Sequence, residues 1–301
     1  MIWDGLAILS AAFNALGSVL QRRGAARAPA ADAMRLRLVL DLARSPATVG
    51  GIGAMIVGVA LQAAALHGAP LTLVEPILVV ELPLTLLLAA RVFGARVERR
   101  TWGAIVLSAA SLAAFLLLAS PSGGGVRRVS TLAWAATLVC TVTLVAGLIA
   151  LALRADGTHR AILLGVAAGA GHGLSATLMK ATTVAAAHGV AAAFGAWQLY
   201  AMVIAGGVSV YLYQNALQAG TLVAAQPALN VTDPGVSVCF GVLLYGEHVR
   251  GGFYVIPEVA AMAALVPALV VLARASAPSL AAGARERRAG ASAHVHAHAG
   301  R

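Results

Sequence analysis

Charged side chains are scarce in this chain: only 11% of its 301 residues are Asp, Glu, Lys or Arg. Soluble domains carry about 25% charged residues, so the composition excludes an ordinary soluble domain. The chain is 60% hydrophobic with a mean hydropathy of +0.87. Several apolar runs approach or exceed the roughly 20 residues that a helix needs to cross a bilayer. The sequence therefore predicts an all-α, polytopic membrane protein.

Cysteine and lysine are almost absent. Cys140 and Cys239 are the only cysteines, and Lys180 is the only lysine. Two distant cysteines inside apolar runs indicate neither a disulfide framework nor a metal knuckle. The net charge of +10 comes from arginines that cluster between apolar runs. This distribution is typical of membrane topology signals, so we expect no nucleic-acid partner.

Motifs of catalysis are also missing. The sequence contains no phosphate-binding loop, nucleophile elbow or zinc-protease helix. No convincing set of nucleophile, acid and base takes their place. We therefore do not expect an enzyme, and we expect no resident cofactor.

What the sequence does contain is a series of apolar segments that predict nine spans. One transmembrane domain, residues 1–275, holds all of them, and the alanine-, glycine-, arginine- and histidine-rich tail, 276–301, is expected to be disordered. The three alternating histidines of this tail lack the further ligands of a metal site. The predicted spans are Ile2–Leu20, Ala47–His67, Pro70–Ala90, Trp102–Ala119, Ser130–Leu153, Ala161–Lys180, Gly195–Leu217, Thr221–Tyr245 and Phe253–Ala273.

An internal repeat relates the two parts of the domain. An offset of 151 residues aligns Glu75-Pro76 with Gln226-Pro227, and it places Glu81 opposite Thr232. The copies are the second to fourth and the seventh to ninth spans, so they cross the membrane in opposite directions. This pattern predicts an inverted repeat of four plus five spans, with halves at about 1–120 and 130–275, as in transporters.

The arginines predict the orientation. With nine spans, 17 of the 21 basic residues fall on one side of the membrane, which is then cytoplasmic. The N-terminus is expected outside and the C-terminus inside. The alanine- and arginine-rich composition favours the cell membrane of a bacterium.

Two carboxylates lie near the middle of predicted spans. Glu81 is in the third span and Asp233 in the eighth, and the repeat relation predicts that both face one midplane cavity. A charge inside the bilayer is costly, so these two are the primary candidates for binding a cation or proton. Glu75, nearer the outer face, is a third candidate. Protonated or helix-bonded structural carboxyls remain the alternative.

Polar side chains on helical stripes extend this candidate site. Gln226, Asn230 and Asp233 follow helical spacing in the eighth span, and Asn14 lies within a similar stripe in the first. They predict either a polar cavity or hydrogen bonds between helices. Prolines close to the carboxylates in both copies indicate either kinks or freed carbonyls that bind a cation.

Three other ionisable residues complete the set. His172, in the sixth span, fits a proton relay or a hydrogen-bonded packing histidine. Lys180 fits a partner for a carboxylate or substrate, or a side chain that snorkels from a helix end. Glu258 is expected to face the membrane interface near the outer end of the ninth span.

Short motifs give a family resemblance. Ala216-Leu217, Pro227, Gly246-Glu247 and Phe253 follow the order of an EamA repeat, and Ala65-Leu66, Pro76 and Trp102 match the first copy in part. The chain thus resembles the drug/metabolite transporter superfamily. Within it, the chain looks most similar to NIPA-type magnesium transporters, in the segments Gly17–Gly24, Ala69–Pro76, Gly171–Lys180 and Tyr211–Pro227.

This resemblance implies nine spans, an outer N-terminus and a transported Mg²⁺. Glu81 and Asp233 would then bind the ion, with Asn14, Gln226 and Asn230 lining the site. The alternatives are a proton-coupled transporter of a small organic metabolite or drug, and a membrane scaffold that transports nothing. The expected partners are the lipid bilayer, the solute and, in a homodimer, a second copy of the chain.

Overall fold

The computed structural model describes residues 2–26, 46–93, 97–123, 129–219 and 222–275. Several predictions fall outside these residues. They concern the tail 276–301 with its histidines, most of the arginines between the first two spans, and Arg127 and Arg128.

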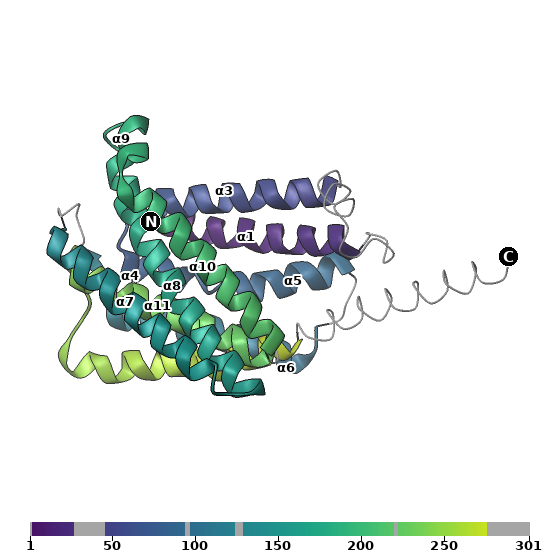
Figure 1. The fold of residues 1–301 in the computed structure, drawn as a ribbon. Helices are drawn as coiled ribbons and strands as arrows, with labels where there is room; N and C mark the ends of the chain where they lie inside the picture. Colours follow the sequence, from purple (N-terminus) through teal and green to yellow (C-terminus); the bar gives the residue numbers. More distant parts are fainter. Residues whose placement is uncertain (1, 27–45, 94–96, 124–128, 220–221, 276–301) are drawn as a thin grey trace, which may run out of the picture.

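The described chain is almost entirely helical (Figure 1). One two-residue antiparallel pair joins β1 (Ser122–Gly123) to β2 (Glu247–His248). A final helical segment, Gly252–Ala275, opens with the 3-10 turn η2 (Gly252–Tyr254). The other helices are α1 (Ile2–Ala26), α3 (Pro46–Gly68), α4 (Leu71–Leu78), α5 (Glu81–Phe93), α6 (Arg99–Ala119), α7 (Thr131–Ala152), α8 (Gly157–Ala186), α9 (Val190–Gly195), α10 (Trp197–Ala219) and α11 (Leu222–Tyr245).

Eight helical segments among the described residues are long and apolar enough to cross a membrane. They confirm the prediction of an all-α, multi-pass membrane protein. α10 is also 23 residues long, but its glutamines and asparagine make it less apolar than these eight. The short helix α9 was not predicted, and α8 extends beyond both ends of the predicted span Ala161–Lys180.

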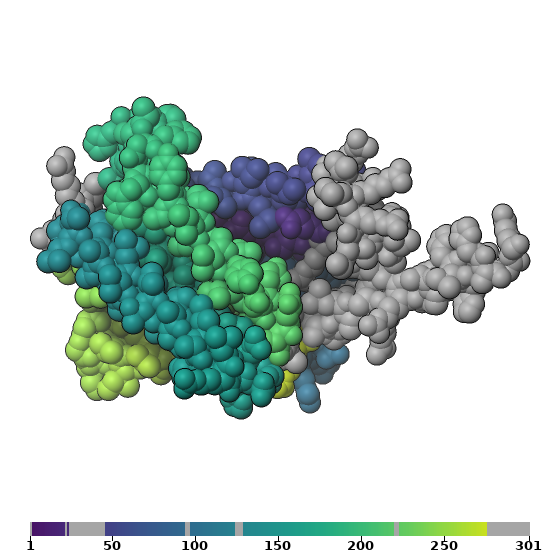
Figure 2. Space-filling model, in the orientation of Figure 1, coloured from purple at the N-terminus to yellow at the C-terminus, as the bar shows by residue number. Residues whose placement is uncertain are grey.

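Apolar side chains point outward over much of the surface. Val139 and Val142 on α7, and Val203 and Ile204 on α10, are each more than 60% exposed. These two helices form much of the face seen in Figure 2, where α1 is recessed behind α3 and α10. Apolar side chains on the outside and polar ones inside suit a protein whose solvent is lipid.

Small residues allow the helices to approach closely. A methyl group added at Gly165, Gly169 or Gly173 of α8 would lie 2.7, 2.8 or 2.9 Å from backbone oxygens of α11. The contacts advance together along both helices, so α8 and α11 run parallel. Their close packing agrees with the four-residue glycine spacing in the sequence.

The third predicted span is broken in the middle. α4 ends at Leu78 and α5 begins at Glu81, so two helices form the predicted span Pro70–Ala90, and the discontinuous alternative that its prolines left open applies here. The N–H of Leu82 bonds the Val79 carbonyl at 3.3 Å instead of the Leu78 carbonyl, and Pro83 has no N–H to offer. The break therefore leaves the Leu78 carbonyl without its regular helical partner.

We call one end of the bundle the β end. There β1 and β2 join the ends of α6 and α11, and the Arg250 N–H bonds the Ala119 carbonyl at 2.9 Å. The turn between α3 and α4 lies at the same end, since Leu71 and Thr72 bond the first residue of β2. Fully buried apolar side chains, including Leu66, Leu71 and Leu178, pack below it.

Candidate functional site

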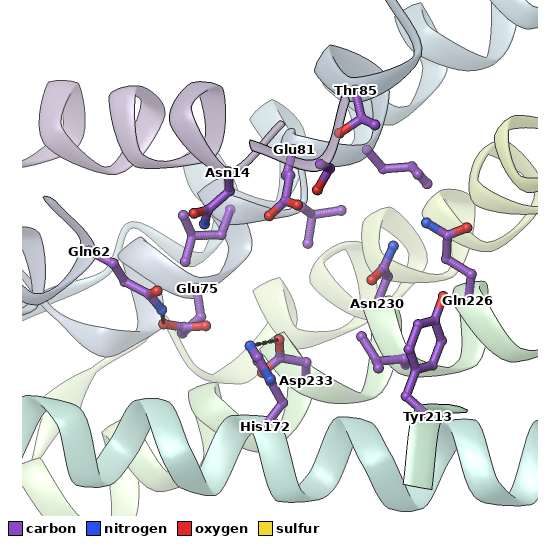
Figure 3. A pocket seen from close by; sticks show the side chains of 15 residues that line it. Asn14, Gln62, Glu75, Glu81, Thr85, His172, Tyr213, Gln226, Asn230 and Asp233 are labelled. Atoms are coloured by element: carbon purple, nitrogen blue, oxygen red, sulfur yellow. Dashed lines mark hydrogen bonds and ion pairs between the residues drawn. The ribbon is translucent and has the colours of Figure 1, made fainter. Parts of the chain in front are cut away.

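A polar cavity of about 320 Å³ lies at the break between α4 and α5. Side chains from α1, α5, α8, α10 and α11 face one another across it, with Gln62 and Glu75 grouped together (Figure 3). Its lining residues are Asn14, Ser18, Gln62, Glu75, Leu78, Val79, Glu81, Leu82, Thr85, His172, Tyr213, Gln226, Leu229, Asn230 and Asp233.

Most of the candidate residues from the sequence meet in this cavity. The two mid-span carboxylates, Glu81 and Asp233, both line it, as the repeat relation predicted. Glu75 lines it as well. The remaining candidates that the fold brings there are Asn14, His172, Gln226 and Asn230. Of the predicted site residues, only Lys180 lies elsewhere.

Local structure explains the positions of the two carboxylates of the broken span. Glu75 is held in α4 at 2% exposure, and the Gln62 amide donates a 2.9 Å hydrogen bond to its Oε1. Glu81 lies in the first turn of α5 and is hydrogen-bonded to Asn14. The helix dipole favours a negative charge at that position. The break thus places one carboxylate on each side of the interruption.

The third carboxylate is less well satisfied. Asp233 faces His172 at 3.9 Å between Oδ2 and Nε2, too long for a hydrogen bond. Its Oδ1 is buried without a hydrogen-bond partner among the described residues, and so is Oε1 of Gln226, two turns earlier on the same face of α11. Buried polar atoms are normally satisfied, so these two oxygens have unused capacity for a cation or a donor group.

The charge of the cavity has one sign. Among the residues that the structure describes, its lining includes three carboxyl groups and one histidine, but no lysine or arginine. An anion would find no compensating charge there, whereas a cation would find several oxygen ligands. The cavity also has an apolar part, formed by Leu78, Val79, Leu82 and Leu229 beside the ring of Tyr213.

Direct coordination of a bare metal ion does not match the geometry. Among the described residues, no three His, Cys, Asp or Glu side chains lie close enough to hold a metal ion together. The cavity instead has room for several water molecules. A cation that keeps most of its water shell fits this arrangement.

Sequence reasoning missed Gln62, Thr85 and Tyr213. Gln62 is an amide inside the apolar second span, the same signal that identified Asn14, so it was detectable. Thr85 and Tyr213 carry small polar groups that are common in membrane helices, and nothing in their spacing distinguishes them. The fold alone reveals their position.

Lys180 belongs to a second buried cluster. It is 4% exposed, so the alternative of snorkelling is wrong, and its Nζ lies 2.6 Å from Oε1 of Glu247. The same Nζ donates to the Ala69 carbonyl at 2.9 Å. Glu247 in turn accepts bonds from the N–H groups of Leu71 at 2.7 Å and Thr72 at 2.8 Å. Every strong partner of this pair is therefore supplied by the protein.

Glu258 requires a correction. It was expected to face the membrane interface, but the side chain is 7% exposed and its Oε1 has no hydrogen-bond partner. It does not line the cavity. Its position near a helix end was misleading, because Glu258 is buried although Ile256 and Val259 on the same turn are exposed.

The fold and the site define a class: an all-α, multi-pass membrane protein with an acidic cavity at a broken helix. Over 244 residues, the chain is 28% identical to an uncharacterized protein of Corynebacterium glutamicum. The match covers 80% of this chain and 83% of that relative. No family model matches the chain. No solved structure matches it either.

Proposed function

We propose that this protein is a membrane transporter that moves a small cation by alternating access, with Mg²⁺ as the leading substrate. One observation carries the proposal: three carboxyl groups line a partly open cavity, and no lysine or arginine is found among its described lining residues. A carboxylate inside a bilayer costs about 2.5–3.5 kcal/mol, so three in one cavity indicate a positively charged occupant.

Mg²⁺ suits the chemistry of the lining. It prefers oxygen ligands and keeps several of its waters, so carboxylates, amides and water can hold it without a compact cage. Glu81 and Asp233 would be its main ligands, with Asn14, Gln226 and Asn230 around the hydrated ion. The Leu78 carbonyl, which lacks its regular helical partner, adds a neutral oxygen at the break, as in discontinuous transporter helices.

The proposal includes the finer architecture. α10 joins the eight apolar segments as the seventh of nine spans, the two parts of the domain form an inverted repeat, and the arginine-rich side faces the cytoplasm of a bacterial cell. The proposal accordingly places the chain in the drug/metabolite transporter superfamily, near the NIPA-type members, which its short motifs resemble. The parallel course of α8 and α11 supports this, because the sixth and eighth spans must cross in the same direction.

A proton-coupled transporter of a small organic cation is the second candidate. Tyr213 and four aliphatic side chains form an apolar part of the cavity, which a bare ion does not need. In that case the amides would bind the solute and the carboxyls would carry protons. Neither candidate is proposed as an enzyme.

Uptake into proteoliposomes tests the proposal. An internal Mg²⁺ indicator should report uptake by the unaltered protein, and Glu81→Gln and Asp233→Asn should each abolish it, since they delete charge but keep size. Glu98→Gln, at an exposed glutamate before α6, is the matched control and should transport normally.

The same vesicles separate the alternatives. An organic solute bound by hydrogen bonds should depend most on Asn14 and Asn230, so Asn14→Ala and Asn230→Ala should then cause the largest losses. The vesicles are also tested with amines and amino acids. If the protein transports none of these and no Mg²⁺, a membrane scaffold is favoured and the proposal is overturned.

A further inference from the structure

The Lys180–Glu247 pair plays no part in the proposed transport site, yet it joins two groups of helices. Lys180 is on α8, and Glu247 directly follows α11. Their other partners are the first two N–H groups of α4 and the Ala69 carbonyl in the turn before it. One carboxylate therefore fastens the end of α11 to the beginning of the broken helix.

The surroundings of the pair are sealed. The side chains of Lys180 and Glu247 are 5% and 0% exposed. The Tyr245 hydroxyl donates a 2.6 Å bond to the Thr177 carbonyl, and the ring centre of Tyr245 lies 5.2 Å from Lys180 Nζ. Gly241 of α11 is so close to Glu247 that an added methyl would collide with its carboxylate. Water thus has no path to the cavity through this cluster.

The cavity reaches toward the opposite end instead. On α11 the cavity lining begins at Gln226, four residues after the helix start. At a rise of 1.5 Å per residue this is about 6 Å. The lining ends at Asp233, which is about 18 Å from the last residue of the helix at the same rise. Ser18 and Thr85 extend the lining in the same direction as Gln226. Buried Leu66, Leu71 and Leu178 fill the remaining distance to the β end.

We propose that the Lys180–Glu247 pair is the gate that closes the cavity at the β end, and that the structure is the state in which this gate is shut. The inference rests on the proposed function as an alternating-access transporter. Opening at the β end requires α4 to separate from α8 and α11, so the bonds of Glu247 to Leu71, Thr72 and Lys180 must break together.

A buried ion pair suits this role. It adds little net stability compared with well-packed apolar side chains, but it holds one geometry while water is excluded. Once water enters, both charges are solvated and the contact weakens. The arginine distribution makes the β end the outer one, so the gate would close the cavity to the outside.

Side-specific labelling of a cavity cysteine tests the gate. The reporter is Leu229→Cys, with the native cysteines replaced by alanine, reconstituted in vesicles and treated with a membrane-impermeant maleimide on one face at a time. With the gate intact, modification should occur only from the face opposite the β end. Labelling of this background from both faces would overturn the proposal.

The principal variant is Lys180→Met combined with Glu247→Gln, which leaves no unpaired buried charge. Modification from the β-end face should become about ten-fold faster, the change that about 1.4 kcal/mol produces in a two-state equilibrium. Gly241→Ala, which displaces the Glu247 carboxylate without altering a charge, is the second variant and should act in the same direction. Glu98→Gln should leave the labelling one-sided.

Two results would refute the gate. If the folded double variant is still labelled from one face only, the pair is a structural fastening. If neither the double variant nor Gly241→Ala yields folded protein, the pair is again structural. Labelling needs no transported solute, so it tests the gate independently of uptake. If the double variant is labelled from both faces but the protein shows no measurable uptake, the proposed function fails and the gate stands.

Discussion

Two groups of buried acids in this protein differ in how far the surrounding groups compensate their negative charge. Glu247 has Lys180 and two backbone N–H groups within 2.6–2.8 Å, so its charge is fully compensated. In the cavity, the described partners of Asp233 amount to His172 at 3.9 Å, and one of its oxygens has none among them. The first arrangement stabilises a fold, whereas the second leaves binding capacity for a ligand.

Glu75 lies between these extremes. It is almost as buried as Glu247, yet the hydrogen bond that it accepts comes from one neutral amide, that of Gln62. Degree of burial alone therefore does not separate structural acids from candidate ligands. The number and charge of the hydrogen-bond donors that the protein supplies do separate them. This difference can be measured as the change in the free energy of unfolding when each acid is substituted.

The largest effect is expected where compensation is complete. Glu247→Ala leaves Lys180 buried without its counter-charge and removes the cap from two N–H groups of α4. We expect a loss of about 3–5 kcal/mol in the free energy of unfolding, as for other broken buried pairs. Thermal unfolding in detergent, followed by tryptophan fluorescence, measures it. A loss below about 1 kcal/mol would place this pair with weak surface ion pairs.

Binding of the transported ion should stabilise the protein through the cavity acids. At a Mg²⁺ concentration of 100 times Kd, the gain is about 2.7 kcal/mol if only the folded state binds. The same thermal scans, with and without Mg²⁺, measure it. Asp233→Asn should abolish the Mg²⁺-dependent gain, whereas Glu98→Gln should retain it. An equal gain in the Asp233 variant would exclude that carboxylate as a ligand.

An intermediate effect is expected at Glu75. Gln62→Ala removes the amide that donates to its Oε1, and an unsatisfied buried acceptor costs about 1–3 kcal/mol. Gln62→Glu should be worse than Gln62→Ala, because it adds a second acid beside the first. Unfolding in urea or heat orders the two variants. A Gln62→Ala protein as stable as the original would mean that water in the cavity replaces the amide.

Much of the cavity lining could be predicted from the sequence, for one physical reason. Ionisable and amide groups inside apolar spans are expensive, so Glu81, Asp233 and Asn14 were conspicuous and had to share a polar space. The same rule applied to Gln62 would have found it. Lys180 was conspicuous too, but its partner depends on how distant loops meet, which hydropathy does not encode.

The helix break was harder to predict, because similar prolines have two outcomes. Pro76 and Pro83 border an interruption, whereas Pro227 and Pro234 lie inside the continuous helix α11. The close packing of α11 on the glycines of α8 supports its full length, and α4 and α5 have no such glycine track against them. Tertiary contacts therefore decide which proline pair interrupts its helix.

The smallest effect on stability should come from the least compensated acid. Asp233→Asn keeps the shape of the side chain, removes a buried charge and gives up only a 3.9 Å interaction with His172. Removal of the desolvation cost offsets that loss, so we expect the free energy of unfolding to change by no more than about 0.5 kcal/mol. The test compares this variant with Glu247→Gln, which makes the same chemical change at the compensated acid. If both amide variants lose equal stability, the two groups of acids do not differ in kind, and Asp233 is as structural as Glu247.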